Sequence, residues 1–285
     1  MKSGLKFAGS HSDYEDSEFV ILGVPYDKTS SFRAGTKNGP AHIRESSYCF
    51  EPYIMEYDIS MNDINIHDAG NLDVEDLGST EDIGEIIKER VNEILNDDKN
   101  PIVIGGEHSI TPFVVESFKK HYSGLHVLIV DAHLDYRDKY EGMKRSHATC
   151  SRRVSETIEL ENLKIVGVRS MSIDESKEDQ IPDHHTSQEI LEDESILQKI
   201  IDKAGSPLYL SIDMDGIDPS YAPGVGNPEP FGLTSIHVKK LISGLADKTV
   251  VLDIMETNPK YDTSEMTTNL ASRLIYEYIG SKKKR

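Results

Sequence analysis

Six short apolar runs constrain the fold of this 285-residue chain more than any other feature. The runs are rich in Val, Ile and Leu and show no regular alternation with polar residues. This pattern is typical of strands that are buried on both faces, as in a parallel sheet. The runs are Phe19–Val24, Ile102–Ile104, Val127–Val130, Lys164–Val168, Leu208–Ile212 and Thr249–Ile254.

Amphipathic helical patterns lie between several of these runs. From Ile83 to Leu95 the apolar side chains follow a 3.6-residue stripe, and Lys, Glu and Asn occupy the other face. Similar patterns occur at Gln188–Lys203, Ile236–Leu245 and Thr268–Ile279. The acidic segment Ser172–Asp193 is predicted to be an excursion on the surface. Strands that alternate with helices predict an α/β domain with a mostly parallel sheet.

Composition excludes several classes of protein. The chain has 50 acidic and 31 basic residues, so its formal charge is −19, which argues against a nucleic-acid partner and suits cations. No apolar run approaches the roughly 20 residues that span a bilayer, so we expect no membrane partner. Cys49 and Cys150 cannot form a disulfide framework, which favours a cytoplasmic location. No linker or repeat divides the chain, and a single domain over residues 1–285 is predicted.

Ionisable residues follow four of the apolar runs. The four segments are Gly105-Gly106-Glu107-His108-Ser109, Asp131-Ala132-His133-Leu134-Asp135, Asp213-Met214-Asp215 and Glu256. Because function gathers at the carboxyl ends of parallel strands, these side chains are expected at one edge of the sheet. In extended chain, alternate side chains point the same way, so Asp131, His133 and Asp135 share one face, and so do Asp213 and Asp215.

Carboxylates that crowd together at a buried edge repel one another, and a bound cation resolves this conflict. Four carboxylates with the imidazoles of His108 and His133 suit two divalent ions. Mostly oxygen ligands with some imidazole favour manganese over structural zinc, and they leave iron, cobalt and nickel open.

Each segment also has a simpler interpretation as a turn, a loop anchor or a surface ion pair, but their combination at four strand ends favours a site. Asp213-Met214-Asp215-Gly216 is similar to the nucleophile motif of haloacid-dehalogenase-like phosphatases, which would leave the other three segments unused. A calcium-binding EF-hand loop requires Gly at position six and Glu at position twelve. Counted from Asp213, those positions hold Asp218 and Gly224.

Taken in order, GGEHS, DAHLD and SIDMDGIDPS resemble the motifs of the ureohydrolases, the arginase and agmatinase family. Gly23–Asp27 with Gly39–Arg44 resembles the family's N-terminal signature, and Ala222–Pro230 resembles its substrate-side loop. The resemblance covers residues 19–279, which leaves 1–18 as an N-terminal extension and 280–285 as a basic tail that we expect to fray. It implies a three-layer αβα arginase-like fold with a central, mostly parallel eight-stranded sheet, assembled as a homotrimer or homohexamer.

The resemblance also implies a site with two manganese ions per subunit. One ion would be held by His108, Asp131, Asp135 and Asp213, and the other by Asp131, His133, Asp213 and Asp215. It assigns Glu256 to the substrate guanidinium and His147 to proton shuttling at the substrate. It makes Asp135 the residue that passes a proton to the leaving amine. Asn227 stands in the substrate-side loop where the family usually has Thr.

The implied reaction is hydrolysis of agmatine to putrescine and urea by attack of a metal-bridging hydroxide on the guanidinium carbon. Arginases typically have Asn two residues past the last Asp of DAHxD, where this chain has Arg137. A basic cluster formed by Arg137, Lys139, Lys144 and Arg145 keeps guanidinobutyrate and formiminoglutamate open as substrates. Arginine and aminopropylagmatine are further alternatives, and so is a non-catalytic, metal-stabilised homologue.

Overall fold

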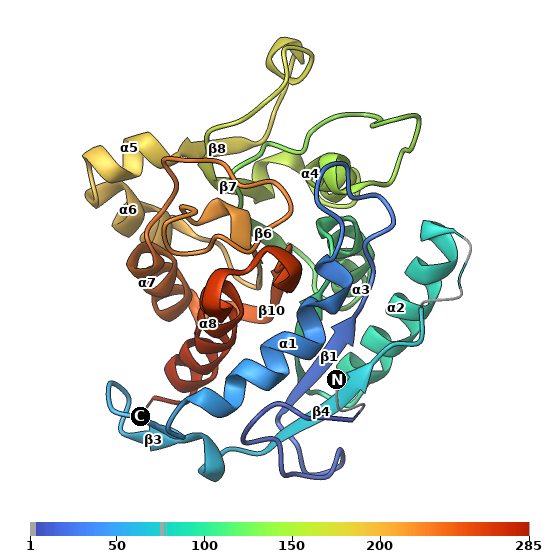
Figure 1. Ribbon diagram of the computed structural model, residues 1–285. Helices are drawn as coiled ribbons and strands as arrows, with labels where there is room; N and C mark the ends of the chain where they lie inside the picture. Colours follow the sequence, from blue (N-terminus) through green and yellow to red (C-terminus); the bar gives the residue numbers. More distant parts are fainter. Residues whose placement is uncertain (1–3, 75–76, 78, 285) are drawn as a thin grey trace.

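A single sheet of eight strands organises the molecule (Figure 1). The computed structural model describes residues 4–74, 77 and 79–284. The strands are β1 (Phe19–Val24), β4 (Ile66–Asn71), β5 (Asn100–Gly105), β6 (His126–Val130), β7 (Leu163–Val168), β8 (Asp183–Thr186), β9 (Leu208–Asp213) and β10 (Thr249–Met255). Their order is β4-β1-β5-β10-β9-β6-β7-β8, and every neighbouring pair is parallel. A two-stranded ribbon, β2 (Tyr53–Ile54) and β3 (Ile59–Ser60), lies apart from this sheet.

Helices cover both faces of the sheet and create two buried cores (Figure 1). One face carries α1 (Gly39–Ser46), α5 (Ser187–Glu192), α6 (Ser195–Lys203), α7 (Ser235–Leu245) and α8 (Met266–Lys283). The other carries α2 (Thr80–Asn96), α3 (Thr111–His121) and α4 (Cys150–Ser155). Successive residues of a strand alternate between the cores, as Phe19 and Val20 do. The predicted three-layer fold is confirmed, and no helix in the described ranges is long and apolar enough to cross a membrane.

All six predicted strands are present, and two further strands form the edges of the sheet. The edge strands β4 and β8 were not predicted, because edge strands contain polar residues and lack a continuous apolar run. The surface excursion predicted for Ser172–Asp193 is therefore only half right. Ile173 is 70% exposed, but β8 pairs with β7 and is followed directly by α5.

The helical pattern over Gln188–Lys203 forms two helices instead of one. The break falls after Glu192, where Asp193 adopts an extended conformation. The Asp193 carboxylate accepts a hydrogen bond of 2.9 Å from the Ser195 N–H, one of the unpaired donors at the start of α6. A local side chain-to-backbone bond thus interrupts a continuous apolar periodicity.

Both ends of the described chain pack against the body of the molecule. Phe7, in the expected N-terminal extension, is 1% exposed and its ring lies 5.6 Å from that of Tyr276. The predicted fraying of the basic tail is wrong for its first residues, because α8 continues to Lys283. The Lys282 ammonium donates to the Ala246 carbonyl at 3.2 Å. Residues 1–3 and 285 lie outside the described residues.

A buried ion pair joins α1 to the edge strand β4. Two nitrogens of the Arg44 guanidinium donate to the two oxygens of Asp68 at 2.7 and 2.8 Å. Both side chains are almost completely buried, and Asp68 also accepts from the Phe7 N–H. The pair therefore ties a helix, an edge strand and the N-terminal segment together.

We expect Arg44→Ala to lower the free energy of unfolding by about 3 kcal/mol, because it leaves the Asp68 carboxylate buried without its counter-charge. Urea unfolding measures this loss. Arg90→Ala is the matched control, since Arg90 pairs with Glu93 on the surface and should cost less than about 1 kcal/mol. Equal small losses in both variants would contradict the importance of the buried pair.

Candidate active site

The four strands that carry the ionisable segments are the four central strands of the sheet, in the order β5-β10-β9-β6. Their register aligns the carboxyl ends, because Ile104 lies level with Ile254 and Met255 lies level with Asp213. Val130 lies level with Ile212, so the DAHLD segment begins at the same height. The ionisable segments therefore meet at one edge, as predicted.

The structure brings five predicted metal ligands into two groups that share one carboxylate. In the first group, His108 Nδ1 lies 3.2 Å from an Asp131 oxygen and 3.0 Å from an Asp213 oxygen. In the second, His133 Nδ1 lies 3.5 Å from the other Asp131 oxygen and 3.1 Å from Asp215. Asp131 belongs to both groups, which suits a bridging ligand.

These groups fit divalent metal ions. His108 Nδ1 is fully buried and, although it lies close to both carboxylates, it makes no hydrogen bond of regular geometry among the described residues, while its Nε2 pairs with the Ser211 hydroxyl at 2.9 Å. Burial, together with the carboxylates of Asp215 and Asp131, raises the pKa of Asp213 well above its ordinary value. A cation would give the orphaned nitrogen a partner and relieve the repulsion between the carboxylates.

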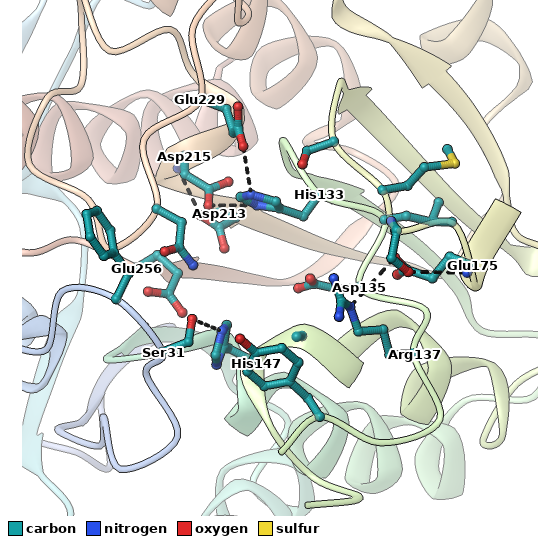
Figure 2. Close-up of a pocket in the computed structure, with 18 of the residues that line it drawn as sticks. Ser31, His133, Asp135, Arg137, His147, Glu175, Asp213, Asp215, Glu229 and Glu256 are labelled. Carbon is teal, nitrogen blue, oxygen red and sulfur yellow. Dashed lines mark hydrogen bonds and ion pairs between the residues drawn. The ribbon is translucent and has the colours of Figure 1, made fainter. Parts of the chain in front are cut away.

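Asp135 and Glu256 lie in one cleft with His133, Asp213 and Asp215 (Figure 2). Both Asp135 and Glu256 have a left-handed backbone conformation. Their φ angles are 51° and 62°, which is uncommon for residues other than glycine. Asp135 lies outside both ligand groups. Positive φ at two residues of one cleft indicates backbone strain held at a functional site.

The Glu256 carboxylate is held in place at the end of β10. Its Oε1 accepts a 2.8 Å hydrogen bond from the His108 N–H, and its own N–H donates to the Gly106 carbonyl at 2.8 Å. Gly106 must be glycine, since a Cβ there would lie 2.0 Å from the Tyr26 carbonyl oxygen. Burial, with the negative charges of Asp213 and Glu107, raises the pKa of Glu256 well above its ordinary value. A cationic ligand is thus the natural partner of this carboxylate.

His147 enters the cleft from a short 3₁₀ turn, His147–Thr149 (Figure 2). Its Nε2 lies 3.1 Å from the Ser31 hydroxyl, and its ring contacts the Tyr140 ring edge-on at 5.5 Å. Burial lowers the pKa of His147 to about 4. The imidazole is therefore neutral at neutral pH.

His133, Asp135, His147, Asp213, Asp215 and Glu256 all line one cleft (Figure 2). Its volume is about 580 Å³, a size typical of small-molecule sites. Asn227 belongs to the lining, as the sequence predicted. Of the basic cluster predicted after Asp135, only Arg137 lines the cleft. Arg145 instead pairs with Glu116 at 2.9 Å, and Lys144 lies 3.8 Å from Glu156. The charged side chains that line the cleft are six carboxylates and the guanidinium groups of Arg33 and Arg137, so its wall is predominantly acidic.

Comparison with known proteins identifies the family. A model of the arginase family matches residues 17–280. The chain belongs to the arginase family. This ureohydrolase is 35% identical to an agmatinase of Bacillus subtilis over 284 residues, which cover 97% of this chain and 96% of the relative.

Two further relatives bear on fold and substrate. The ureohydrolase superposes on the crystal structure of agmatine ureohydrolase of Thermoplasma volcanium with a TM-score of 0.93 and 34% identity, covering 98% and 94% of the two chains. A guanidinobutyrase of Pseudomonas aeruginosa is 32% identical over 286 residues, covering 96% of this chain and 89% of its own. The family inferred from the motifs is confirmed.

Sequence reasoning missed two acidic residues of this arginase-family site. Glu229 lines the cleft, and its Oε1 lies 3.8 Å from His133 Nε2. Its position within the Ala222–Pro230 segment was the available signal. Glu107 is completely buried and accepts hydrogen bonds from Thr29, which lies far away in the sequence. No local pattern could have indicated that contact.

We expect the stability of this ureohydrolase to fall between about pH 6.5 and pH 4, in part because of His147. The unfolded chain protonates this residue near pH 6.5, whereas burial keeps its pKa at about 4 in the folded protein. The unfolded state therefore binds the proton first, which costs about 2 kcal/mol of stability at about pH 5. Urea unfolding at about pH 7.5 and 5 measures this loss of stability. The metal-free wild type is compared with metal-free His147→Asn. Equal losses in both proteins would contradict the buried, neutral histidine.

Proposed function

We propose that this arginase-family protein hydrolyses agmatine to putrescine and urea, with two manganese ions at the paired ligand groups. One observation carries the proposal. The buried Glu256 carboxylate faces the cleft beside both groups, with one oxygen held by the His108 N–H. A carboxylate fixed in this way can bind a guanidinium through charge-assisted hydrogen bonds.

The chain's own residues supply binding and proton transfer. Divalent ions at the two groups would supply a water molecule acidic enough to ionise near neutral pH. Glu256 would align the guanidinium so that its carbon is open to attack. Asp135 would pass a proton to the leaving amine as the carbon–nitrogen bond breaks. His147 would exchange protons between the cleft and solvent, since it is neutral at neutral pH.

The charge of the cleft supports agmatine, which is a dication. Glu229 adds a carboxylate on the wall that carries His133, and Arg137 lies against the carboxylate of Glu175 at 3.8 Å and over the Tyr140 ring at 5.2 Å. The names of the Bacillus and Thermoplasma relatives agree with this substrate. Guanidinobutyrate is the second candidate, because Arg137 lines the cleft and could meet a carboxylate tail.

Urea release by the manganese-loaded protein tests the proposal. Agmatine, guanidinobutyrate and arginine are assayed in parallel, with a chelator-treated control for each. Metal-dependent urea from agmatine alone is expected. Faster turnover of guanidinobutyrate would overturn the agmatine assignment. Oligomeric state and cytoplasmic location stay predictions.

We expect His147→Asn to slow turnover by about 100-fold without releasing metal. The substitution removes the group that accepts and returns protons, and general acid–base catalysis contributes on the order of 10²–10⁴. His147 belongs to neither ligand group, so metal content measured after gel filtration should equal that of wild type. Loss of metal, or an unchanged rate, would contradict the assigned role.

A further inference from the structure

A chain of buried hydrogen bonds lies behind His147 and leads to a carboxylate outside the proposed reaction. Glu107 is 0% exposed and Thr29 is 4% exposed. The Thr29 N–H donates to Glu107 Oε2 at 2.8 Å, and the Thr29 hydroxyl lies 2.6 Å from Oε1. The same hydroxyl lies 3.1 Å from the His147 backbone nitrogen and 3.4 Å from Nδ1 of its ring. Thr29 thus stands directly between Glu107 and His147.

The direction of each hydrogen bond in this chain follows from its chemistry. The backbone N–H of His147 can only donate, so the Thr29 oxygen must accept from it. The single hydroxyl proton of Thr29 is then free to donate to the Glu107 carboxylate, and the 2.6 Å separation is typical of a charge-assisted O–H···O⁻ bond. With its proton committed to Glu107, Thr29 can offer only a lone pair to the imidazole.

That lone pair selects one form of the imidazole. A neutral histidine carries its proton on one ring nitrogen, and the hydrogen bond at the other nitrogen determines which one. Nδ1 faces a pure acceptor in Thr29, so Nδ1 holds the proton and Nε2 is left bare. The Ser31 hydroxyl, 3.1 Å away on the cleft side, can donate to that bare nitrogen (Figure 2).

We propose that Glu107 and Thr29 are positioning residues that hold His147 in the Nδ1–H tautomer, with the Nε2 lone pair directed into the cleft. A proton from the cleft then binds at Nε2, and the resulting imidazolium keeps its Nδ1–H on Thr29 until Nε2 releases the proton to solvent. The inference rests on the proposed function for the role of His147. The chain from Glu107 through Thr29 to His147 is similar to a catalytic triad, in which an acidic residue orients a histidine. Here the Thr29 hydroxyl lies between the acid and the histidine.

Nitrogen NMR of the histidine rings tests the tautomer without any turnover. The protein is labelled with ¹⁵N-histidine and loaded with Zn²⁺, which is diamagnetic, and His147→Asn identifies the resonances of His147. Wild type should show a protonated Nδ1 and an unprotonated Nε2. Thr29→Val, which keeps the shape of the side chain but removes the hydroxyl, should shift the population toward Nε2–H. Thr29→Ser should restore the wild-type pattern.

Ser30→Ala is the matched control for the tautomer. Its hydroxyl also reaches Glu107, at 3.3 Å, but no hydrogen bond joins it to His147 among the described contacts. It should leave the tautomer unchanged. A protonated Nε2 in wild type, or an unchanged tautomer in a folded Thr29→Val protein, would overturn the proposal.

Kinetics with the substrate that releases urea give a second readout. Thr29→Val should lower kcat by about 10- to 100-fold with little change in KM, because the loss of the correct tautomer removes part of the roughly 10²–10⁴-fold that general acid–base catalysis contributes. Thr29→Ser should recover most of the rate. If Thr29 had a purely structural role, Thr29→Val would not lower kcat selectively over KM, and Thr29→Ser would not restore the rate. Failure of the agmatine assignment alone would leave the tautomer result intact, so the two failures are distinguishable.

Discussion

Asp213→Asn is expected to abolish turnover and to reduce bound metal to a small fraction of the wild-type content. Asp213 lies 3.0 Å from the orphaned His108 Nδ1, and its other oxygen accepts from the Asp215 N–H at 2.8 Å. An amide keeps the shape of the side chain but loses the charge that balances a divalent ion. Turnover should fall by more than about 1,000-fold, because ordinary water has a pKa of about 15.7 against about 7 when bound to a metal.

Urea release together with elemental analysis of the dialysed protein measures both effects. Asp202→Asn, on the exposed surface of α6, is the control for loss of one carboxylate and should behave as wild type. Asp135→Asn is also expected to abolish turnover. Near-normal rates for Asp213→Asn and Asp135→Asn with metal supplied would contradict the proposed site.

Glu256→Gln is expected to lower kcat/KM by about 1,000-fold while metal content stays at the wild-type level. The amide cannot form the charge-assisted hydrogen bonds to a guanidinium, which contribute about 1.5–3 kcal/mol. Loss of alignment at the reacting carbon can cost a further factor of about 100. Metal should be retained, because Glu256 belongs to neither ligand group.

Steady-state kinetics and elemental analysis separate these effects. Glu265→Gln is the matched control, since Glu265 is exposed and follows the same strand. A tenfold loss or less in Glu256→Gln would indicate that another group binds the guanidinium. Loss of metal in this variant would instead make Glu256 part of the metal centre.

The edges of the sheet mark the limit of prediction from local pattern. The central strands are buried on both faces, so their sequences are continuous apolar runs, which predict strands directly. The edge strand β8 reads Asp-His-His-Thr and carries no such signal. Its existence depends on pairing with β7, a contact between segments that the sequence alone does not join.

The candidate site also has features that the local sequence predicts and features that it does not. The carboxylates of Asp131, Asp135, Asp213 and Asp215, together with two imidazoles, indicated metal binding, because carboxylates that crowd together at a buried edge need a cation. The left-handed backbone at Glu256 and the link from Glu107 through Thr29 to His147 could not be predicted. Backbone strain and contacts over 78 and 118 residues arise only when distant segments pack together.

The sequence by itself determined the α/β class, the family and the residue types of the two candidate ligand groups, because burial periodicity and ligand chemistry are local properties. The tertiary structure decided that β5, β10, β9 and β6 are neighbours in register, which gathers four separate segments into one cleft. It also decided which basic residues reach that cleft and which turn away to surface partners. Strand order is a non-local property, and it follows from the packing of both helical layers against the sheet.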